Sequence, residues 1–567
     1  MDGKLVRAAR GLEPADLVLK GGRVLNVFTE EFLEADVAIV GDQIAGVGNY
    51  RGKTEIDCTG KYLVPGLIDG HMHMESTMVA PPRLAGCVVR KGTTTMIVDP
   101  HEIVNVAGTE GMEYMLESTR NVPVNIFVMI PSSVPAADID SNGAGKILAE
   151  DMKPYLENPR VLGLGEMMRF MDVLNEDPET LEKLELFQNR MMDGHAPGIT
   201  GGDVQGYRVS GICSDHECTT ADELLEKLRA GFYILIREGS AARDLEPLVK
   251  GLLDKKLPPE RCMFCTDDKH LEDIEREGHI NFCVKKAISL GIPPVKAYKM
   301  ASYYTAAAYG LRRLGAVSAG YQADILVLEH LEEARPELVF QKGTLVDEKR
   351  IRDGFYETQK ESLLHTVVCP QIKPEDLRLK VQEKNHVLEM LPKQLLTRHL
   401  LECIPEKEGW FQPNQTYSKL LAVERYGRTG RIAVCAAKGY GIQGGAVATS
   451  VSHDAHNIIA AGDNDEDILA AVEELKRMQG GYAIASGGRI LASLPLPVGG
   501  LMSQEDAETV QEKIRVMTEI ARNMGVARGI DPFITLSFMA LPVIPEIRLT
   551  EAGLYDVTLG KLIEQQN

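Results

Sequence analysis

The stretch Val64-Pro65-Gly66-Leu67-Ile68-Asp69-Gly70-His71-Met72-His73 is a short apolar run that ends in two histidines separated by one residue. On a β-strand, residues two apart point to the same face, so His71 and His73 face the same way. Two imidazoles at the end of one strand can bind a single metal ion through their ring nitrogens. The alternative is a pair of core or surface histidines that share this spacing by chance. Residues further along the chain favour the metal site.

Four more potential metal ligands fall at the ends of other strand-like runs, and they are Glu166, His195, His216 and Asp267. Glu166 follows a run of small and apolar residues, and a carboxylate there can bridge two metal ions through its two oxygens. Asp267 can bind a metal ion and also accept a proton from water, which suits a general base that later acts as an acid. One such ligand alone would mean little, but six of them at strand ends indicate an active site.

These ligands lie in a region, residues 66–310, that alternates strand-like runs with helical patterns. Eight runs have the character of buried strands, at 67–73, 94–99, 124–130, 161–166, 191–195, 211–216, 233–237 and 262–267. Residues 221–228, between the sixth and seventh runs, and residues 245–253, between the seventh and eighth, have helical spacing. Eight such units in roughly 250 residues predict a (β/α)8 TIM-like barrel, in which active sites lie at the carboxyl ends of the strands.

The regions on either side of the barrel have a different pattern. Short strands with turn residues between them run through residues 1–65, with Gly21-Gly22 as one turn, and similar strands return in residues 311–362. We expect the two flanks to form one small β-sandwich domain, with the barrel inserted between them. Residues 363–567 are expected to form a separate mixed α/β domain, in which 465–478 and 505–524 have helical spacing. The fold class is therefore α/β.

The composition limits the partners and the compartment. The chain has 567 residues and a formal net charge of -20, which argues against nucleic acid or an anionic membrane as a partner. No apolar stretch is long enough to cross a bilayer, and the first residues lack a signal-peptide core. Ten cysteines without a regular framework fit a reducing compartment. We therefore expect a cytoplasmic protein without a nucleic-acid or membrane partner.

Some assignments stay open from the residues alone. Asp268 follows Asp267, and strand alternation lets only one of the two face the site, while either can cap the next helix. His101 can hydrogen-bond a substrate or a metal ligand, or it can be an ordinary loop histidine. His453 and His456 are spaced to share a helix face, but no third ligand is evident near them. We leave that pair unassigned.

Several of these motifs resemble the amidohydrolase superfamily. They are residues 65–73, the strand-end residues Glu166, His195, His216 and Asp267, and residues 320–325, which resemble that superfamily's return into its β-sandwich. Within the superfamily the chain looks like the adenine deaminase family nearly end to end. The more specific matches are His71-Met72-His73-Met74-Glu75-Ser76, Asp99-Pro100-His101-Glu102, Asp193-Gly194-His195-Ala196-Pro197-Gly198 and Thr266-Asp267-Asp268.

The resemblance implies hydrolysis of adenine to hypoxanthine and ammonia, a reaction of purine salvage. It implies two divalent metal ions, commonly Mn²⁺ or Fe²⁺ with Zn²⁺ as an alternative, and the ligands would be His71, His73, Glu166, His195, His216 and Asp267. Asp267 would transfer the proton, and His101 and Glu217 would bind the purine base. Protonation of ring nitrogen N1 needs a further donor, for which Glu217 is a guess. The relatives are commonly homo-oligomers, so we expect one here, such as a dimer.

Two features separate the chain from other amidohydrolases. Hydantoinases and dihydroorotases carry a carboxylated lysine as the metal bridge, where this chain has Glu166. Adenosine deaminases carry a His-Ala-x-Glu pattern, whereas Ala196 here is followed by Pro197 and Gly198. Two alternatives to adenine deamination stay open, namely a cyclic-amide hydrolase on the same scaffold and a metal-binding protein that has lost catalysis.

Overall fold

Eight parallel strands form the centre of the molecule, in a computed structural model that describes residues 3–240, 242–356 and 360–564. The strands are β6 (Leu67–Met72), β7 (Thr93–Val98), β8 (Asn125–Ile130), β9 (Val161–Met167), β10 (Met191–Gly194), β11 (Ser214–Asp215), β12 (Tyr233–Arg237) and β13 (Cys262–Cys265). Each lies within or next to a predicted run, although β11 is much shorter than the predicted 211–216. Most of their residues are buried, as expected for parallel strands covered by helices on the outside.

The eight strands close into a barrel. They pair in two groups, β10-β9-β8-β7-β6 and β11-β12-β13. At one junction the N–H of Cys213 donates to the carbonyl of Met192 at 2.9 Å, which links β11 to β10. At the other, the N–H of Asp267 donates to the carbonyl of His71 at 3.0 Å, which links the end of β13 to β6. The predicted (β/α)8 barrel is therefore confirmed, and the second junction lies within the candidate site.

Helices cover the outside of the barrel. They include α2 (Pro81–Arg90), α3 (His101–Ala107), α4 (Thr109–Ser118), α7 (Pro178–Phe187), α8 (Gly202–Val209), α9 (Ala221–Arg229), α10 (Leu245–Asp254), α11 (Leu271–Glu277) and α12 (Ile280–Leu290). The helix predicted over 221–228 begins with a capping box, in which the Thr220 and Glu223 side chains satisfy each other's backbone N–H groups. Across the described ranges, no helix is long and apolar enough to span a membrane.

The two flanks join in one sheet beside the barrel, as predicted. Its strands are β1 (Ala15–Asn26), β2 (Glu31–Val40), β3 (Gln43–Gly48), β4 (Gly52–Asp57), β5 (Tyr62–Pro65), β14 (Ile325–Leu328), β15 (Pro336–Gln341) and β16 (Thr344–Leu345). Antiparallel pairing of β5 with β14 joins the first flank to the second. The turn predicted at Gly21-Gly22 is wrong, because β1 continues through it with a bulge between Leu19 and Gly22.

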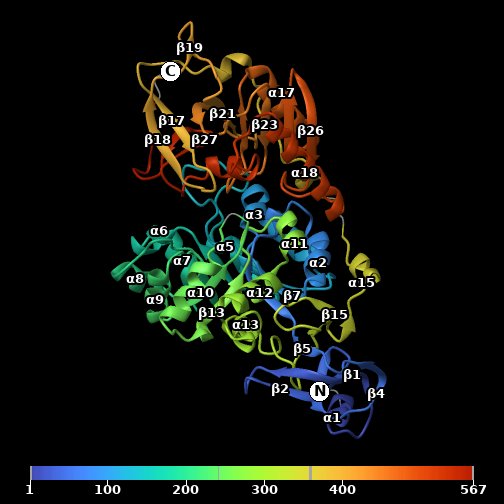
Figure 1. Cartoon of the computed structure of the whole chain (residues 1–567). Coiled ribbons are helices and arrows are strands. Elements are labelled where there is room, and N and C mark those ends of the chain that lie inside the picture. Colours follow the sequence, from blue (N-terminus) through green and yellow to red (C-terminus); the bar gives the residue numbers. More distant parts are fainter. Residues whose placement is uncertain (1–2, 241, 357–359, 565–567) are drawn as a thin grey trace.

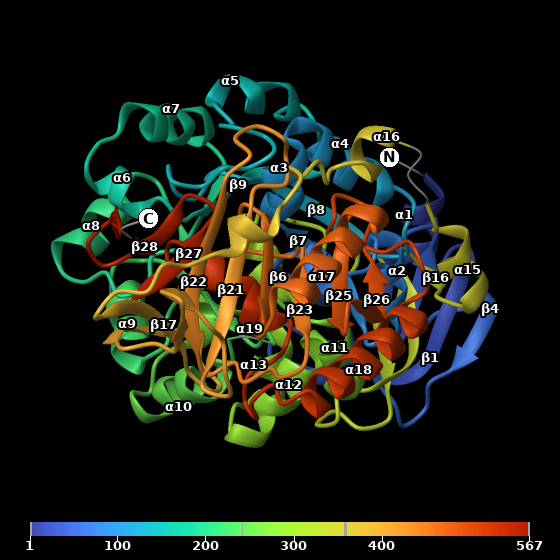
Figure 2. The same cartoon turned by 90° about the horizontal axis from the view of Figure 1, so that it is seen from above.

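The C-terminal region, from residue 385 onward, is a second mixed sheet. Its strand order is β18-β17-β22-β21-β24-β23-β25-β26. The bounds are β17 (Asn385–Met390), β18 (Thr397–Glu402), β21 (Tyr417–Val423), β22 (Ile432–Lys438), β23 (Ala446–Thr449), β24 (Ile458–Gly462), β25 (Gly481–Ser486) and β26 (Arg489–Pro495). Helices α17 (Asp465–Met478) and α18 (Ala507–Asn523) confirm the two predicted there. This region lies at the end of the barrel where α3 follows β7, and seen from above it covers the barrel (Figures 1 and 2).

Candidate active site at the carboxyl ends of the barrel strands

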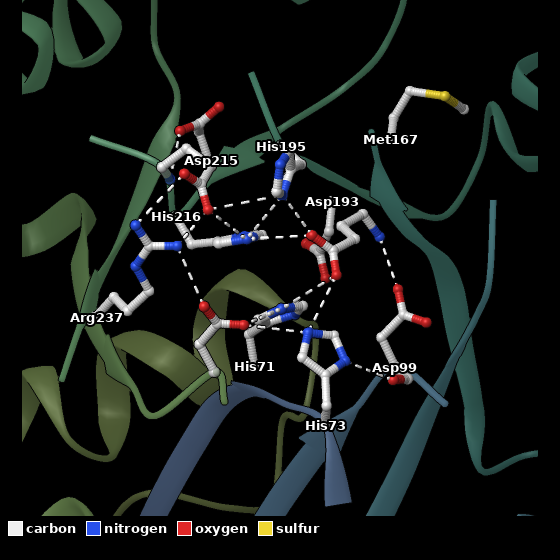
Figure 3. A network of polar contacts seen from close by, with 12 residues as sticks. His71, His73, Asp99, Met167, Asp193, His195, Asp215, His216 and Arg237 are labelled. Atoms are coloured by element: carbon white, nitrogen blue, oxygen red, sulfur yellow. Dashed lines mark hydrogen bonds and ion pairs between the residues drawn. The ribbon is translucent and has the colours of Figure 1, made fainter. Parts of the chain in front are cut away.

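The six candidate ligands predicted from the sequence all lie at the carboxyl end of the barrel. His71 and Glu166 are on β6 and β9. His73, His195 and His216 directly follow their strands, and Asp267 lies two residues after the end of β13. All are buried except His195, whose side chain is 21% exposed. Figure 3 shows the imidazole rings of His71, His73, His195 and His216 gathered around the carboxylates between them. The structure therefore brings together all six residues.

Glu166 lies between two pairs of imidazoles. Its Oε1 is 3.1 Å from Nε2 of His73 and 3.7 Å from Nε2 of His71. Its Oε2 is 2.6 Å from Nδ1 of His195 and 3.2 Å from Nε2 of His216. Each oxygen thus faces one pair, which is the arrangement that a carboxylate bridging two cations requires.

Asp267 completes the first pair. Its Oδ1 is 3.1 Å from Nε2 of His73 and 3.6 Å from Nε2 of His71. Three overlapping triads among the six residues each have ligand atoms within 4.8 Å of one another: His71, His73 and Glu166; His71, His216 and Asp267; and Glu166, His195 and His216. Imidazole nitrogens with carboxylate oxygens form a donor set that divalent transition metals accept.

The tautomer of His73 also fits a metal ligand. Its Nδ1 lies 2.8 Å from the carbonyl oxygen of Asp99, so Nδ1 carries the proton and donates it. In the neutral ring Nε2 is then the nitrogen without a proton, and it points to the carboxylates of Glu166 and Asp267, where a cation would sit. A hydrogen bond from the distal nitrogen to a carbonyl is the usual support of a metal-binding histidine. Nε2 of His71 is buried without a hydrogen-bond partner among the described residues, which is a further sign that the site is built for a cation.

Charges around the site favour ionised carboxylates. Burial alone would raise the pKa of Asp267, but His71, His73 and the Arg237 guanidinium lower it well below its ordinary value. Burial would likewise raise the pKa of Glu166, but the neighbouring imidazoles, His216 first, lower it well below its ordinary value. Both side chains are therefore ionised and can bind cations.

The open choice between Asp267 and Asp268 rested on strand alternation, and that premise is wrong. β13 ends at Cys265, and Asp267 has a left-handed φ of 54°, so its side chain no longer follows the alternation of the strand. Both carboxylates line the same cavity. Asp268 is also not a helix cap, because α11 begins after His270, and it instead accepts a hydrogen bond from the hydroxyl of Ser76.

The two predicted substrate-binding residues lie on the walls of that cavity. Nδ1 of His101 is 3.3 Å from Oε1 of Glu166, and Oε1 of Glu217 is 3.7 Å from Nδ1 of His195. Arg237, at the end of β12, pairs with both Glu217 and Asp267, and its Nη1 is 3.1 Å from Oδ2 of Asp267. Sequence reasoning did not assign Arg237, although a charged residue ending an apolar strand is the signal that identified Glu166.

The cavity has a volume of about 400 Å³, and the C-terminal region supplies much of its wall. Leu395, Phe538, Leu541 and Ile544 line it opposite the charged residues of the barrel. A mostly apolar cavity with a few convergent polar groups is typical of a small-molecule site. The sequence did not predict this contribution, because these residues lie far beyond the last barrel strand in the chain and no local pattern links them to the site.

His453 and His456 have a third partner, which corrects the expectation that none was near. They lie between β23 and β24 rather than on a helix, and both contact the carboxylate of Glu102 on α3, with Nδ1 of His453 at 2.5 Å. The N–H of Ser452 donates to Nδ1 of His456 at 3.1 Å, so the proton of His456 is on Nε2 and points to Glu102. The cluster is therefore a hydrogen-bonded bridge between the barrel and the C-terminal region, and the tautomer of His456 does not suit a metal ligand.

Comparison with known proteins places the chain in a family. Residues 62–347 match the amidohydrolase family, and residues 394–561 match the adenine deaminase C-terminal domain. The adenine deaminase of Desulfitobacterium hafniense is 48% identical over 561 residues, which is 99% of this chain and 98% of that protein. Adenine deaminase 2 of Carboxydothermus hydrogenoformans is 45% identical, over 99% of this chain and 98% of that protein. The adenine deaminase of Clostridium acetobutylicum is 42% identical, over 98% of this chain and 99% of that protein. With this likeness over nearly the whole chain, the protein belongs to the adenine deaminase family of amidohydrolases.

Proposed function

We propose that the protein hydrolyses adenine to hypoxanthine and ammonia, as an enzyme of purine salvage. The observation that carries this proposal is the position of Glu166 between two imidazole pairs at the carboxyl end of the barrel, with Asp267 beside them. The likeness to adenine deaminases along the whole chain supports adenine as the substrate. The cavity of about 400 Å³ has room for a free base.

Two divalent metal ions are the cofactors that we propose, either Mn²⁺ or Fe²⁺, with Zn²⁺ as the alternative. His71, His73 and Asp267 would hold one ion, His195 and His216 the other, and Glu166 would bridge them. When bound, such ions lower the pKa of a water molecule toward neutrality, so that hydroxide is available to attack C6 of adenine. The set of imidazoles and carboxylates described above supports this assignment.

The residues of the chain then handle the protons. Asp267 accepts the proton of the attacking water and delivers it to the exocyclic nitrogen, so that the C6–N6 bond breaks and ammonia leaves. Arg237 holds Oδ2 of Asp267 at 3.1 Å, which leaves Oδ1 directed toward the imidazoles. Burial alone would raise the pKa of Glu217, but Arg237 lowers it, so Glu217 binds the base as an acceptor and is a poor proton donor. We propose that His101, which lines the cavity with its Nδ1 3.3 Å from Oε1 of Glu166, binds the base beside Glu217.

The first test is ammonia release from adenine by protein loaded with Mn²⁺ or Fe²⁺, beside a metal-stripped sample. Metal-dependent release, with hypoxanthine formed in equal amount, is the expected result. The variant Asp267→Asn should lose this activity, whereas Asp254→Asn, at the exposed end of α10, should keep it. Ring opening of a hydantoin without ammonia release from adenine would contradict the proposal and favour a cyclic-amide hydrolase. Metal binding with neither reaction would favour an inactive metal-binding protein.

Three further assignments are proposals of the same kind. We propose a cytoplasmic location, which the ten free cysteines support. We propose a homodimer, which light scattering of the purified protein would test. We also propose domain boundaries at residues 1–65 with 311–362, 66–310, and 363–567, which limited proteolysis would test.

A further inference from the structure

Asp454 is a buried carboxylate that the proposed mechanism does not use. It belongs to the C-terminal region, is only 4% exposed, and lines the cavity above the barrel. Its Oδ2 has no hydrogen-bond partner in the part of the chain that the structure describes. A buried carboxylate that lacks a donor is costly, and Asp454 lines the cavity, so a donor from a bound molecule is the natural partner of its carboxylate.

Asp454 is held in place from both sides. His453 and His456, which flank its turn, both contact Glu102, so the turn is fixed to α3 of the barrel. Oδ1 of Asp454 is 4.0 Å from Nε2 of His101, which lies at the edge of the six candidate ligands. Its carboxylate is therefore a fixed acceptor on the side of the cavity that the C-terminal region supplies.

From this arrangement we infer that Asp454 accepts the ring N–H of a free purine base, an inference that rests on the proposed deamination. The reacting C6 of the purine must face the barrel ligands, so its imidazole half points away from them. That half carries one N–H, on N9 or N7, and it is the donor farthest from the reaction. Asp454 then determines specificity, because a nucleoside has no N–H on this ring and would leave the buried carboxylate unpaired.

The apolar wall agrees with this role. Phe538 stacks on the ring of His453, with centroids 4.4 Å apart and planes at 20°. Together with Leu541 and Ile544, it gives the cavity an apolar surface beside Asp454. A purine can place its faces against such a surface while its single ring N–H meets the carboxylate of Asp454. Hydrophobic contact would then supply affinity, and Asp454 would supply orientation.

The test compares purine isosteres that differ only in this N–H. 7-Deazaadenine keeps the N9–H and 9-deazaadenine keeps the N7–H, and in the furan isostere of each an oxygen atom replaces that N–H. Inhibition constants against adenine are measured for the wild type, Asp454→Ala and Asp454→Asn. Asp353→Ala, which changes an exposed aspartate at the end of α15 (Glu348–Asp353), is the matched control.

We expect the wild type and the control to bind one deaza isomer about 10- to 100-fold more tightly than its furan isostere, as for a hydrogen bond to a charged acceptor. Asp454→Ala should lose that preference, and Asp454→Asn should keep part of it, because the amide oxygen still accepts. If Asp454→Ala fails to fold, the test rests on two measurements: the preference of the wild type for a deaza isomer over its furan isostere, and the reduction of that preference in Asp454→Asn. No preference in the wild type, or an equal loss of affinity for all four compounds in both variants, would overturn the inference. If the wild type releases no ammonia from adenine, the proposed function fails, and calorimetric binding of the same compounds still tests Asp454.

Discussion

Lys227 and Asp215 form a buried ion pair that we expect to stabilise the candidate site. It lies on α9, its Nζ is 2.8 Å from Oδ1 of Asp215, and the two side chains are 1% and 0% exposed. Asp215 also accepts the N–H of Ala196 at 3.0 Å and the N–H of Glu217 at 2.9 Å. The pair therefore anchors the two loops that carry His195 and His216.

The perturbation is Lys227→Met, which keeps the length of the side chain but removes its charge. Asp215 would remain as a buried, uncompensated carboxylate, and breaking a buried ion pair in this way costs about 3–5 kcal/mol. Lys250→Met is the matched control, because its pair with Glu246 is 57% and 50% exposed. An exposed pair of this kind contributes about 0.3–0.5 kcal/mol.

The assay is hydrogen exchange, measured by mass spectrometry on peptides that cover β12. A loss of about 3–5 kcal/mol accelerates exchange through unfolding by about 10²- to 10³-fold or more, whereas the control should change it by less than about threefold. The double variant Lys227→Met with Asp215→Leu should recover part of the loss, because no unpaired charge stays buried. Equal exchange in Lys227→Met and Lys250→Met would refute the reasoning, since the buried pair would then contribute no more than an exposed one.

Three other outcomes follow from the site. Asp267→Asn should lower ammonia release from adenine by about 10²- to 10⁴-fold, because it removes the proposed proton acceptor, and a steady-state ammonia assay checks this. Burial lowers the pKa of His453, but Glu102 raises it to about 9, above the ordinary value of 6.5. The contact between His453 and Glu102 should therefore stabilise the fold fully below pH 6.5 and lose this effect as the pH rises through about 9. Between pH 6 and 10, the urea midpoint of unfolding should fall more steeply in the wild type than in Glu102→Gln. A chelator should abolish ammonia release and lower the thermal midpoint, and Mn²⁺ should restore both.

The barrel and its ligands could be predicted from the sequence for a physical reason. Parallel strands buried on both sides read as continuous apolar runs, and the polar residue that ends such a run stands out. Glu166, His195, His216 and Asp267 each end or follow a run of this kind, and the structure brings them together. The fold rule that places barrel sites at the carboxyl ends of strands then suffices to group them without coordinates.

The rest of the site depends on contacts between distant parts of the chain. Glu102 meets His453 across 351 positions, and no periodic pattern relates the two. The side-chain direction of Asp267 depends on a left-handed backbone that begins where β13 stops, which the apolar run does not reveal. The bulge at Gly21-Gly22 was predicted as a turn because consecutive glycines are typical of turns. Here β1 continues instead, and the N–H of Gly21 donates to Oδ1 of Asp36 at 2.9 Å.

Helix α3 couples the two halves of the site through adjacent residues. His101 turns toward Glu166 in the barrel, and Glu102 turns toward His453 in the C-terminal region. Successive side chains on a helix point about 100° apart, so one rigid turn serves both directions. A shift of the C-terminal region would therefore move His101 as well as Asp454. The residue proposed to bind the ring N–H, Asp454, would then move together with His101, which lies beside Glu166. Affinity for the base and the rate of deamination should consequently respond together to changes at Glu102, even though Glu102 itself lies outside the six candidate ligands.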